Sequence, residues 1–408
     1  MNPLRYLFID FNAYFASVEQ QLDPKLRGKP VAVVPTEADT TSCIAASYEA
    51  KKFGVKTGTL VRDAKRMCPG LICVHARHLH YIEYHHKLIE AVDSCLPVLK
   101  VMSIDEMVCE LTGSQQQREK ALALAHQIKS TIAKNVGEYL RCSIGIAPNI
   151  FLSKTGSDLQ KPNGLVVIEP KDLPQCLFKL ELRDIYGVGH RMEQRLRASG
   201  INSVQDLWNA DKTQLHKVWG GIEGERMYDN LRGEFVYSPP THKSTVGHSH
   251  VLAPEYRTEE KAYAVLHRLL QKAAYRLRSY ELLAGAMYVK IKYFNNARWS
   301  DEMNFTATND TVHFINALAT MWKRKQPVHQ TPLKVAITLF KLSEEKTKPL
   351  QLFPFGRSSE ALNKAVDKLN SMYKKNTVYY GGAHEALDSA PMRIAFTHIP
   401  DPEIEGDE

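Results

Sequence analysis

Three carboxylates follow apolar segments at two places in the sequence. Asp10 closes the apolar run 6–9, and the adjacent pair Asp105 and Glu106 follows the apolar segment 99–104. Short apolar runs of this kind are typical of buried strands, so both places are expected strand ends. Hard divalent cations such as Mg²⁺ prefer oxygen ligands, and two ions held by shared carboxylates can activate one oxygen and stabilise another in phosphoryl transfer. The sequence therefore predicts a divalent-cation site.

Apolar runs and helical periodicity alternate over the first 168 residues. Strands that alternate with helices are typical of an α/β unit, in which functional sites form at strand ends. This pattern agrees with the positions of Asp10 and Asp105. The expected strands are 31–34, 72–74, 141–146 and 165–168, and the expected helices are 81–96 and 119–135.

Short helices separated by glycine are expected between residues 171 and 233. Gly187 and Gly189 precede one helix, and Gly221 and Gly224 accompany another. A glycine-containing turn that enters a helix can offer backbone N–H groups and the helix N-terminus to a phosphate. Two ordinary turns between helices would give the same pattern, so the spacing leaves both interpretations open.

A basic α+β segment follows the proline-containing linker 236–243. Residues 243–348 hold 17 Lys or Arg and 9 Asp or Glu, and thus the whole net charge of +8. Lys290 and Lys292 fall on one face of an expected strand, which fits a sheet that contacts a phosphate backbone. A solvated face is the alternative meaning of this charge bias. The expected helices are 259–280 and 312–324, and the expected strands are 286–293 and 333–339.

The composition describes a multidomain cytoplasmic protein. A chain of 408 residues exceeds what one hydrophobic core supports, so we expect two to four domains. The seven cysteines are scattered and never form C-x-x-C, which disfavours a disulfide framework and a zinc ribbon. No apolar stretch approaches the roughly 20 residues of a membrane helix, and no signal-peptide pattern is present. Residues 401–408 carry five acidic side chains, and we expect this tail to be disordered.

Five short motifs occur in order along the chain. They are FIDFNAYFASVE at 8–19, YEAKKFGV at 48–55, SIDE at 103–106, KPNG at 161–164 and GVG at 187–189. In type, order and spacing they resemble the Y-family of translesion DNA polymerases, the DinB and UmuC kind. A single motif would be weak evidence, whereas five in register are specific. The resemblance covers at least residues 1–345.

The resemblance implies a multidomain polymerase shaped as a right hand, with α/β and α+β domains. A ferredoxin-like palm and small fingers would be followed by a thumb of helix-hairpin-helix motifs and an α+β little finger. The implied boundaries are 1–18 and 78–168 for the palm, 19–77 for the fingers, 169–235 for the thumb, 236–243 for the linker, 244–345 for the little finger and 346–408 for a C-terminal extension.

The resemblance also implies the chemistry of the three carboxylates. Asp10, Asp105 and Glu106 are similar to the catalytic residues that hold two Mg²⁺ ions in the family, a role that Mn²⁺ could also fill. The backbone carbonyl of Phe11 would add a ligand. One ion would lower the pKa of the primer 3′-hydroxyl, and the other would bind the triphosphate and stabilise the leaving pyrophosphate.

Phe15 matches the steric gate of the family, a ring that leaves no room for a ribose 2′-hydroxyl. Outside this motif, an aromatic side chain at helical spacing would be read as part of the core. Other residues are implied to bind the incoming nucleotide or to contact the nascent base pair. The nucleotide-binding residues are Tyr14, Tyr48, Lys51 and Lys161, and the base-pair residues are Ile44 and Gly58.

Three positions depart from the family pattern. Asn12 stands where a second Asp is common, and we expect activity to survive because this position is not a principal ligand. Lys51 stands where Arg is usual, so the bidentate contact to a phosphate is lost. Ile44 is bulkier than the residue in some relatives, which would limit the lesions that fit beside it.

The thumb hairpins and the little finger are the parts that would bind DNA. The hairpins with Gly187, Gly189, Gly221 and Gly224 resemble motifs that hold the duplex backbone without reading sequence. The little finger would contribute Lys290 and Lys292. The segment 349–353, with Leu350, Leu352 and Phe353, is similar to a peptide that binds the bacterial sliding clamp. A buried strand or a packed linker is the competing interpretation of this segment.

The resulting prediction is a DNA-directed DNA polymerase for translesion synthesis with low fidelity. Its partners would be primer-template DNA, dNTPs and the sliding clamp, and it would act as a monomer associated with the nucleoid. The alternative is a weakly active or inactive family member that serves as a DNA- and clamp-binding adaptor. A metal-dependent nuclease or cyclase with a similar palm would not need the hairpins and the basic domain together.

Overall fold

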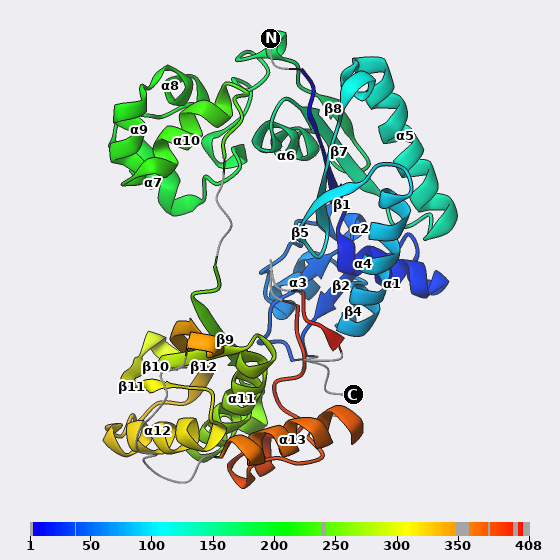
Figure 1. The fold of residues 1–408 in the computed structure, drawn as a ribbon. Helices are drawn as coiled ribbons and strands as arrows, with labels where there is room; N and C mark the ends of the chain where they lie inside the picture. The colour runs from blue at the N-terminus through cyan, green and yellow to red at the C-terminus, as the bar shows by residue number, and fades with distance from the viewer. Residues whose placement is uncertain are drawn as a thin grey trace. The chain divides into compact units, whose positions relative to one another are not determined.

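The computed structural model describes residues 3–36, 38–237, 242–347, 359–373, 376–394 and 399–402. The chain divides into two compact units, one of residues 1–239 with 395–399 and one of residues 240–394 with 400–408. Figure 1 shows the helices and strands of both units. Within the described residues, the first unit contains a five-stranded and a three-stranded sheet, and the second contains a four-stranded sheet.

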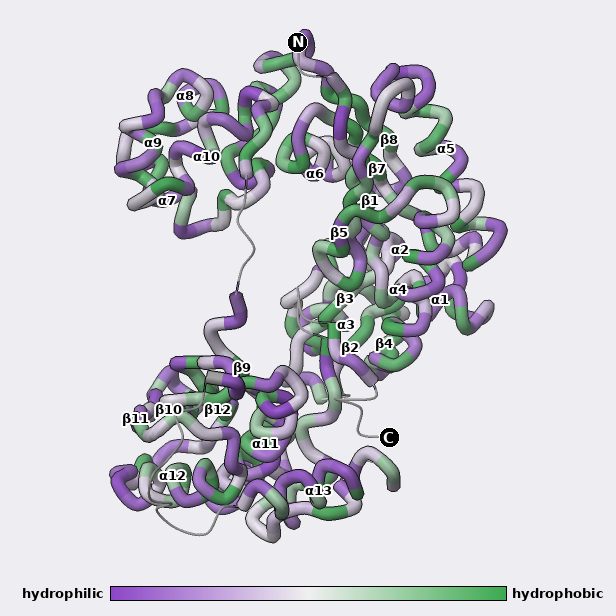
Figure 2. The backbone as a smooth tube through the Cα atoms, viewed as in Figure 1, coloured by the Kyte–Doolittle hydropathy of each residue, from purple (hydrophilic) through white to green (hydrophobic). Residues whose placement is uncertain are grey.

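The five-stranded sheet has the order β5-β6-β1-β7-β8, with β1 buried at its centre. Strands β5, β6, β1 and β7 pair antiparallel, and β8 pairs parallel with β7. Strands β1 and β7 are strongly hydrophobic, as Figure 2 shows, because both are covered by helices. The strand bounds are Tyr6–Phe11 for β1, Val98–Ser103 for β5, Glu106–Glu110 for β6, Cys142–Ala147 for β7 and Leu165–Val167 for β8.

Three helices pack against this sheet. Helix α6 contacts β1, β7 and β8, whereas α4 and α5 contact each other and contact β5 and β7, respectively. Leu7 and Ile9 on β1 are fully buried. The helices span His78–Asp93 for α4, Arg118–Asn135 for α5 and Ile150–Leu159 for α6.

A smaller sheet, of order β3-β2-β4, lies beside helix α1 (Tyr14–Leu22). It has its own apolar cluster, which we call the small cluster, made of alanine, valine and cysteine side chains. The elements are β2 (Val31–Val34), β3 (Ala45–Ala46), α2 (Tyr48–Lys51), α3 (Val61–Met67) and β4 (Ile72–His75). The small cluster comprises Ala32, Val34, Cys43, Ala46, Ala50, Val55, Val61, Ala64 and Cys68.

Four short helices form a bundle at the end of the first unit. Their leucines pack into one apolar cluster. Asn149, the N-cap of α6, connects the bundle to that helix, because its Nδ2 donates to the carbonyl oxygens of Asn230 at 2.9 Å and Glu234 at 3.0 Å. The helices are α7 (His190–Ala198), α8 (Val204–Asn209), α9 (Lys212–Trp219) and α10 (Ile222–Leu231).

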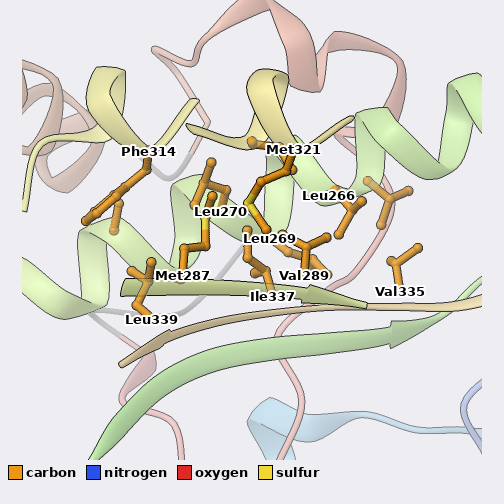
Figure 3. Packing of buried hydrophobic residues seen from close by; sticks show 14 of the residues in the cluster. Leu266, Leu269, Leu270, Met287, Val289, Phe314, Met321, Val335, Ile337 and Leu339 are labelled. Carbon is orange, nitrogen blue, oxygen red and sulfur yellow. The ribbon is translucent and has the colours of Figure 1, made fainter. Parts of the chain in front are cut away.

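The second unit is an antiparallel sheet of order β11-β10-β12-β9 covered by two helices. Figure 3 shows the core between them, where Leu269 and Met321 from the helices meet Val289 and Ile337 from the sheet. The elements are β9 (Thr245–Val251), α11 (Glu259–Ser279), β10 (Leu282–Tyr293), β11 (Arg298–Thr308), α12 (Thr311–Arg324) and β12 (Pro332–Glu344).

The segment after β12 covers helix α11. Helix α13 (Glu360–Tyr373) is joined to α11 by a two-pronged ion pair, in which Arg278 Nε and Nη2 donate to the Asp367 carboxylate at 2.7 and 2.8 Å. Further along, Ala386 and Ala390 belong to the buried core of the unit. The described residues 360–373 and 376–394 are therefore an integral layer of the second unit.

Most predicted elements are present within a few residues of their expected bounds. The helix expected at 81–96 spans His78–Asp93, and the strand expected at 286–293 begins earlier, at Leu282. Among the elements that were not predicted are strands β3, β6, β9 and β11 and helices α1, α2, α3, α6, α9 and α13. The clamp-like segment 349–353 and most of the acidic tail lie outside the described residues.

Candidate active site

Strand pairing brings the three predicted carboxylates together. Asp10 lies directly opposite Glu106 in the antiparallel pair of β1 and β6. Asp105 occupies the short turn between β5 and β6, and its carbonyl oxygen accepts the Phe11 N–H at 2.8 Å. The spacing of the site is thus set by main-chain hydrogen bonds between neighbouring strands.

Two lysines lie among these carboxylates. Lys154 on α6 is buried, and its Nζ is 2.7 Å from both Asp10 Oδ2 and Glu106 Oε1. Lys161 Nζ is also 2.7 Å from Asp10 Oδ2, and Asp158 pairs with both lysines. Lys154 was missed by sequence reasoning. Its spacing from Asp158, one helical turn along α6, was the available signal.

The pKa values of the site reflect an excess of negative charge. The pKa of Asp105 is raised to about 6, mainly by burial and also by the nearby Asp10 and Glu106 carboxylates, against a hydrogen bond from Ser103 and the charge of Lys154. Burial alone would lower the pKa of Lys154, but the Asp10, Asp158 and Glu106 charges outweigh it and raise that pKa. Four carboxylates and two ammonium groups leave the cluster with a deficit of positive charge.

The donor set fits a hard divalent cation. Three carboxylates and the backbone carbonyl of Phe11 supply the oxygen atoms that such ions prefer. In the described part of the chain, no three acidic, histidine or cysteine side chains are gathered closely enough to hold an ion as they stand. Instead, Lys154 and Lys161 both lie against the Asp10 carboxylate.

The side chains of Phe15 and Tyr14 differ in their exposure to solvent. The Phe15 ring is partly exposed and stacks on Tyr81, with 4.4 Å between ring centroids and 16° between planes. Tyr14 is buried, and its hydroxyl donates to the Tyr81 carbonyl oxygen at 2.6 Å. The Tyr14 side chain thus packs α1 on α4, and its predicted contact with the nucleotide stays a prediction. Phe15 is the ring that remains accessible.

Lys51 and Tyr48 were predicted, together with Lys161, to bind the triphosphate, and Lys51 adds positive charge near the carboxylates. Lys51 Nζ lies 4.3 Å from the centre of the Tyr48 ring at the start of α2. Burial lowers the pKa of Lys51, and the like charge of Lys161 lowers it further, while Asp10 and Asp105 oppose this effect. Two partly buried lysines that repel each other are a favourable place for an anion.

Ile44 and Gly58 are neighbours through the main chain. Gly58 N–H donates to the Cys43 carbonyl oxygen at 2.8 Å, and the Thr57 hydroxyl donates to the Ile44 carbonyl oxygen at 3.3 Å. Gly58 has φ +89°, a conformation that glycine adopts at low cost. The two predicted base-pair residues therefore belong to one local structure of the three-stranded sheet.

The glycines of the helical bundle have different roles. Gly187 turns the chain with φ +85°, and Gly189 is the N-cap of α7. Gly221 is the N-cap of α10, whose first turn carries Glu223 and Glu225, so a phosphate is disfavoured at this helix start. Of the two hairpins, the one before α7 is therefore the more favourable for the predicted phosphate contact.

Gly224 was predicted to contact DNA, and that contact stays a prediction. The residue is buried where α9 and α10 meet, and a Cβ there would lie 2.1 Å from the Leu215 carbonyl oxygen. The absence of a side chain allows the two helices to approach closely. Gly224 is therefore a packing residue.

Lys290 and Lys292 share one face of β10, as expected. They alternate with the buried Val289, Ile291 and Tyr293. Their contact with DNA stays a prediction. Leu350, Leu352 and Phe353 lie outside the described residues.

No helix of the described chain is both long and apolar enough to cross a membrane.

Three family models match successive parts of the chain. The impB/mucB/samB family model matches residues 9–158, and the model of its C-terminal domain matches residues 243–352. The model described as the thumb domain of DNA polymerase-iota matches residues 183–234. These ranges include the carboxylate site, the basic sheet and the four-helix bundle.

Solved structures of Y-family polymerases share the fold. A Y-family DNA polymerase chimera of Dbh and Dpo4 has a TM-score of 0.70 at 24% identity, and covers 84% of this chain and 100% of its own. The insertion ternary complex of Dbh DNA polymerase has a TM-score of 0.55 at 26% identity, and covers 83% of this chain and 98% of its own.

Curated bacterial proteins are similar over almost the whole length. DNA polymerase IV of Moorella thermoacetica is 31% identical over 381 residues, which is 91% of this chain and 94% of that protein. DNA polymerase IV 1 of Bacillus subtilis is 30% identical over 404 residues, which is 95% of each. With three family models matching in order along the chain and relatives 30–31% identical over more than nine tenths of it, the chain belongs to the Y-family of translesion DNA polymerases.

Proposed function

We propose that this polymerase joins a deoxynucleotide to a primer 3′-hydroxyl at the Asp10, Asp105 and Glu106 site, with two Mg²⁺ ions or with Mn²⁺ in their place. The observation that carries the proposal is the pairing of Asp10 with Glu106 across β1 and β6, with Asp105 in the adjoining turn. The Phe11 carbonyl completes the donor set. Such ions, when bound, lower the pKa of the primer hydroxyl and stabilise the leaving pyrophosphate.

Residues around the carboxylates would orient the incoming nucleotide. Lys161, Lys51 and Tyr48 form the positive group beside Asp10, and their charge suits a triphosphate. The accessible ring of Phe15 would lie against the sugar and exclude a 2′-hydroxyl. Ile44 would contact the nascent base pair, so its side chain would influence which damaged templates fit.

The remaining parts would hold DNA. We place the palm at 1–18 and 78–168, the fingers at 19–77, the thumb at 169–235, the linker at 236–243, the little finger at 244–345 and the C-terminal extension at 346–408. Lys290 and Lys292 of the little finger and the α7 hairpin of the thumb would contact phosphates in a sequence-independent, salt-sensitive manner. The segment 349–353 would bind a sliding clamp. A related polymerase, Dbh, is described in an insertion ternary complex, which supports binding of DNA and nucleotide.

Primer extension on undamaged and abasic templates tests this proposal. Wild-type protein with Mg²⁺ should extend both primers, and Asp105→Ala/Glu106→Ala should extend neither. Glu110→Ala is a matched control, because Glu110 lies on the same strand but pairs with Arg5 away from the site. This control should keep full activity. If the wild-type protein binds primer-template DNA but extends neither primer, the adaptor role replaces the enzymatic one.

A further inference from the structure

We propose that Asn12 and Lys129 are positioning residues that fix the turn 161–164 and thereby hold Lys161 at the triphosphate site. The inference rests on the proposed contact of Lys161 with the triphosphate. It assigns a role to Asn12, which departs from the family pattern, and to a lysine on a helix outside the site.

The Asn12 side chain is buried and bonded at both ends. Its Oδ1 accepts the main-chain N–H of Asn163 at 2.7 Å, and its Nδ2 donates to Ser143 Oγ at 3.1 Å. Its own main chain is held as well, because its N–H donates to Arg141 O at 2.8 Å and its carbonyl accepts from Ser17 Oγ at 2.7 Å. The carboxamide therefore has a fixed place beside β1 and links that strand directly to the turn.

Ser143 extends this link to both ends of the turn. Its hydroxyl oxygen accepts the Gly164 N–H at 3.2 Å, and the hydroxyl donates to the Gln160 carbonyl oxygen at 3.2 Å. When Asn12 donates to Ser143, the Ser143 proton is available for Gln160. An aspartate at position 12 has no proton to donate, so the Ser143 hydroxyl would turn toward it and leave the Gln160 carbonyl without this bond. The amide thus suits the network better than the carboxylate common in the family.

Lys129 holds the same turn from the other side. From helix α5, its Nζ lies 2.7 Å from the Asn163 carbonyl oxygen, 3.0 Å from Asn163 Oδ1 and 2.8 Å from the Gly164 carbonyl oxygen. Asn163 has φ +58°, in the left-handed region, and the three bonds stabilise that conformation. The turn is therefore anchored by two separate elements of the five-stranded sheet layer.

The anchored turn begins with the lysine that matters for substrate. Lys161 Nζ is 2.7 Å from Asp10 Oδ2 and 2.8 Å from Asp158 Oδ1. Asp10 and Asn12 are two residues apart in the sequence, so one short segment carries both a metal ligand and the anchor of the triphosphate lysine. The distance between the Asp10 carboxylate and the Lys161 ammonium group is consequently set within this segment.

Single-turnover incorporation of a correct dNTP tests the inference, because it separates the apparent dNTP dissociation constant from the maximal rate. The variants are Asn12→Ala, Lys129→Met and Lys161→Ala, together with the double variants that contain Lys161→Ala. Lys134→Met is the matched control, since it makes the same change at an exposed site on α5.

We expect Asn12→Ala and Lys129→Met each to raise the apparent dNTP dissociation constant about five- to tenfold, the usual effect of losing one buried or charged hydrogen bond. The maximal rate should fall less. In the Lys161→Ala background neither change should raise the constant further, because both act through Lys161. Lys134→Met should leave both parameters unchanged.

Two results would overturn the inference while leaving Lys161 in its proposed role. One is an unchanged dissociation constant in Asn12→Ala and Lys129→Met, and the other is an effect of equal size with and without Lys161. If Lys161→Ala itself leaves the constant unchanged, the proposed triphosphate contact fails, and the inference built on it fails too. Circular dichroism of Lys129→Met, which lies outside the carboxylate cluster, identifies any loss of folding.

Discussion

His85 should make the palm sensitive to acid. It is almost completely buried on α4, and its Nδ1 lies 2.8 Å from the carbonyl oxygen of Ile104, the residue before Asp105. In this position the neutral imidazole donates a hydrogen bond to the active-site turn. The pKa of His85 is lowered to about 4, because burial outweighs the hydrogen bond to Ile104, which raises it, and His86 adds a smaller lowering.

The sign and size of the effect follow from the two pKa values. In the unfolded chain His85 should titrate near 6.5, so below that pH the unfolded state binds a proton that the folded state resists. The neutral, buried His85 therefore contributes fully to the stability of the folded state above pH 6.5, and this contribution is lost as the pH falls toward 4. A difference of about 2.5 pKa units corresponds to roughly 3 kcal/mol.

Hydrogen exchange followed by mass spectrometry provides a local measurement, since the chain has two units and a single unfolding transition is not expected. The opening free energy of α4 and the adjoining turn would be measured at pH 7.5 and 4.5 for wild type and for His85→Gln, whose amide can donate but cannot be protonated. The wild type should lose roughly 2 to 3 kcal/mol more than the variant between these pH values. Parallel pH dependence in the two proteins would refute the reasoning.

Three further substitutions test other parts of the molecule. Phe15→Ala should raise ribonucleotide incorporation at least tenfold by opening space at the sugar, and an unchanged ratio of ribonucleotide to deoxynucleotide efficiency would contradict the gate assignment. Lys290→Ala/Lys292→Ala should lower the slope of log affinity for DNA against log salt by about 2, and a slope equal to that of the wild type would exclude these phosphate contacts. Gly224→Ala should destabilise the α9–α10 pair by about 3 kcal/mol, because the new Cβ meets the Leu215 backbone; undiminished exchange protection of both helices would contradict the packing role.

Each half of the carboxylate site was predictable because a local pattern marks it. Asp10 ends a short apolar run, and Asp105 and Glu106 follow another, and the long-range pairing of β1 with β6 then brings the two halves together. Lys154 was not predictable in the same way. Its partner Asp10 lies 144 positions away, and a lysine on a helix is usually a solvated residue. The hydrogen bond from Asn163 to Asn12 spans 151 positions and was equally hidden.

Secondary-structure prediction failed for an edge strand with little burial and for a short helix. Strand β11 alternates exposed and partly buried positions at the edge of its sheet, so it has no apolar run to mark it. Helix α9 is only eight residues long and was merged into the glycine pattern. Gly224 was predicted to contact DNA because it is a glycine near a helix start. The sequence did not show how closely α9 packs against α10 at this residue.

The small cluster of the fingers has a consequence for local unfolding. Its side chains are alanine, valine and cysteine, so the sheet that carries Ile44, Tyr48 and Lys51 buries little apolar area compared with the palm. Elements held by few apolar contacts open at a lower free energy than the elements around them. The sheet proposed to cover the incoming nucleotide is therefore expected to open transiently while the carboxylates, fixed by the β1–β6 ladder, stay in register.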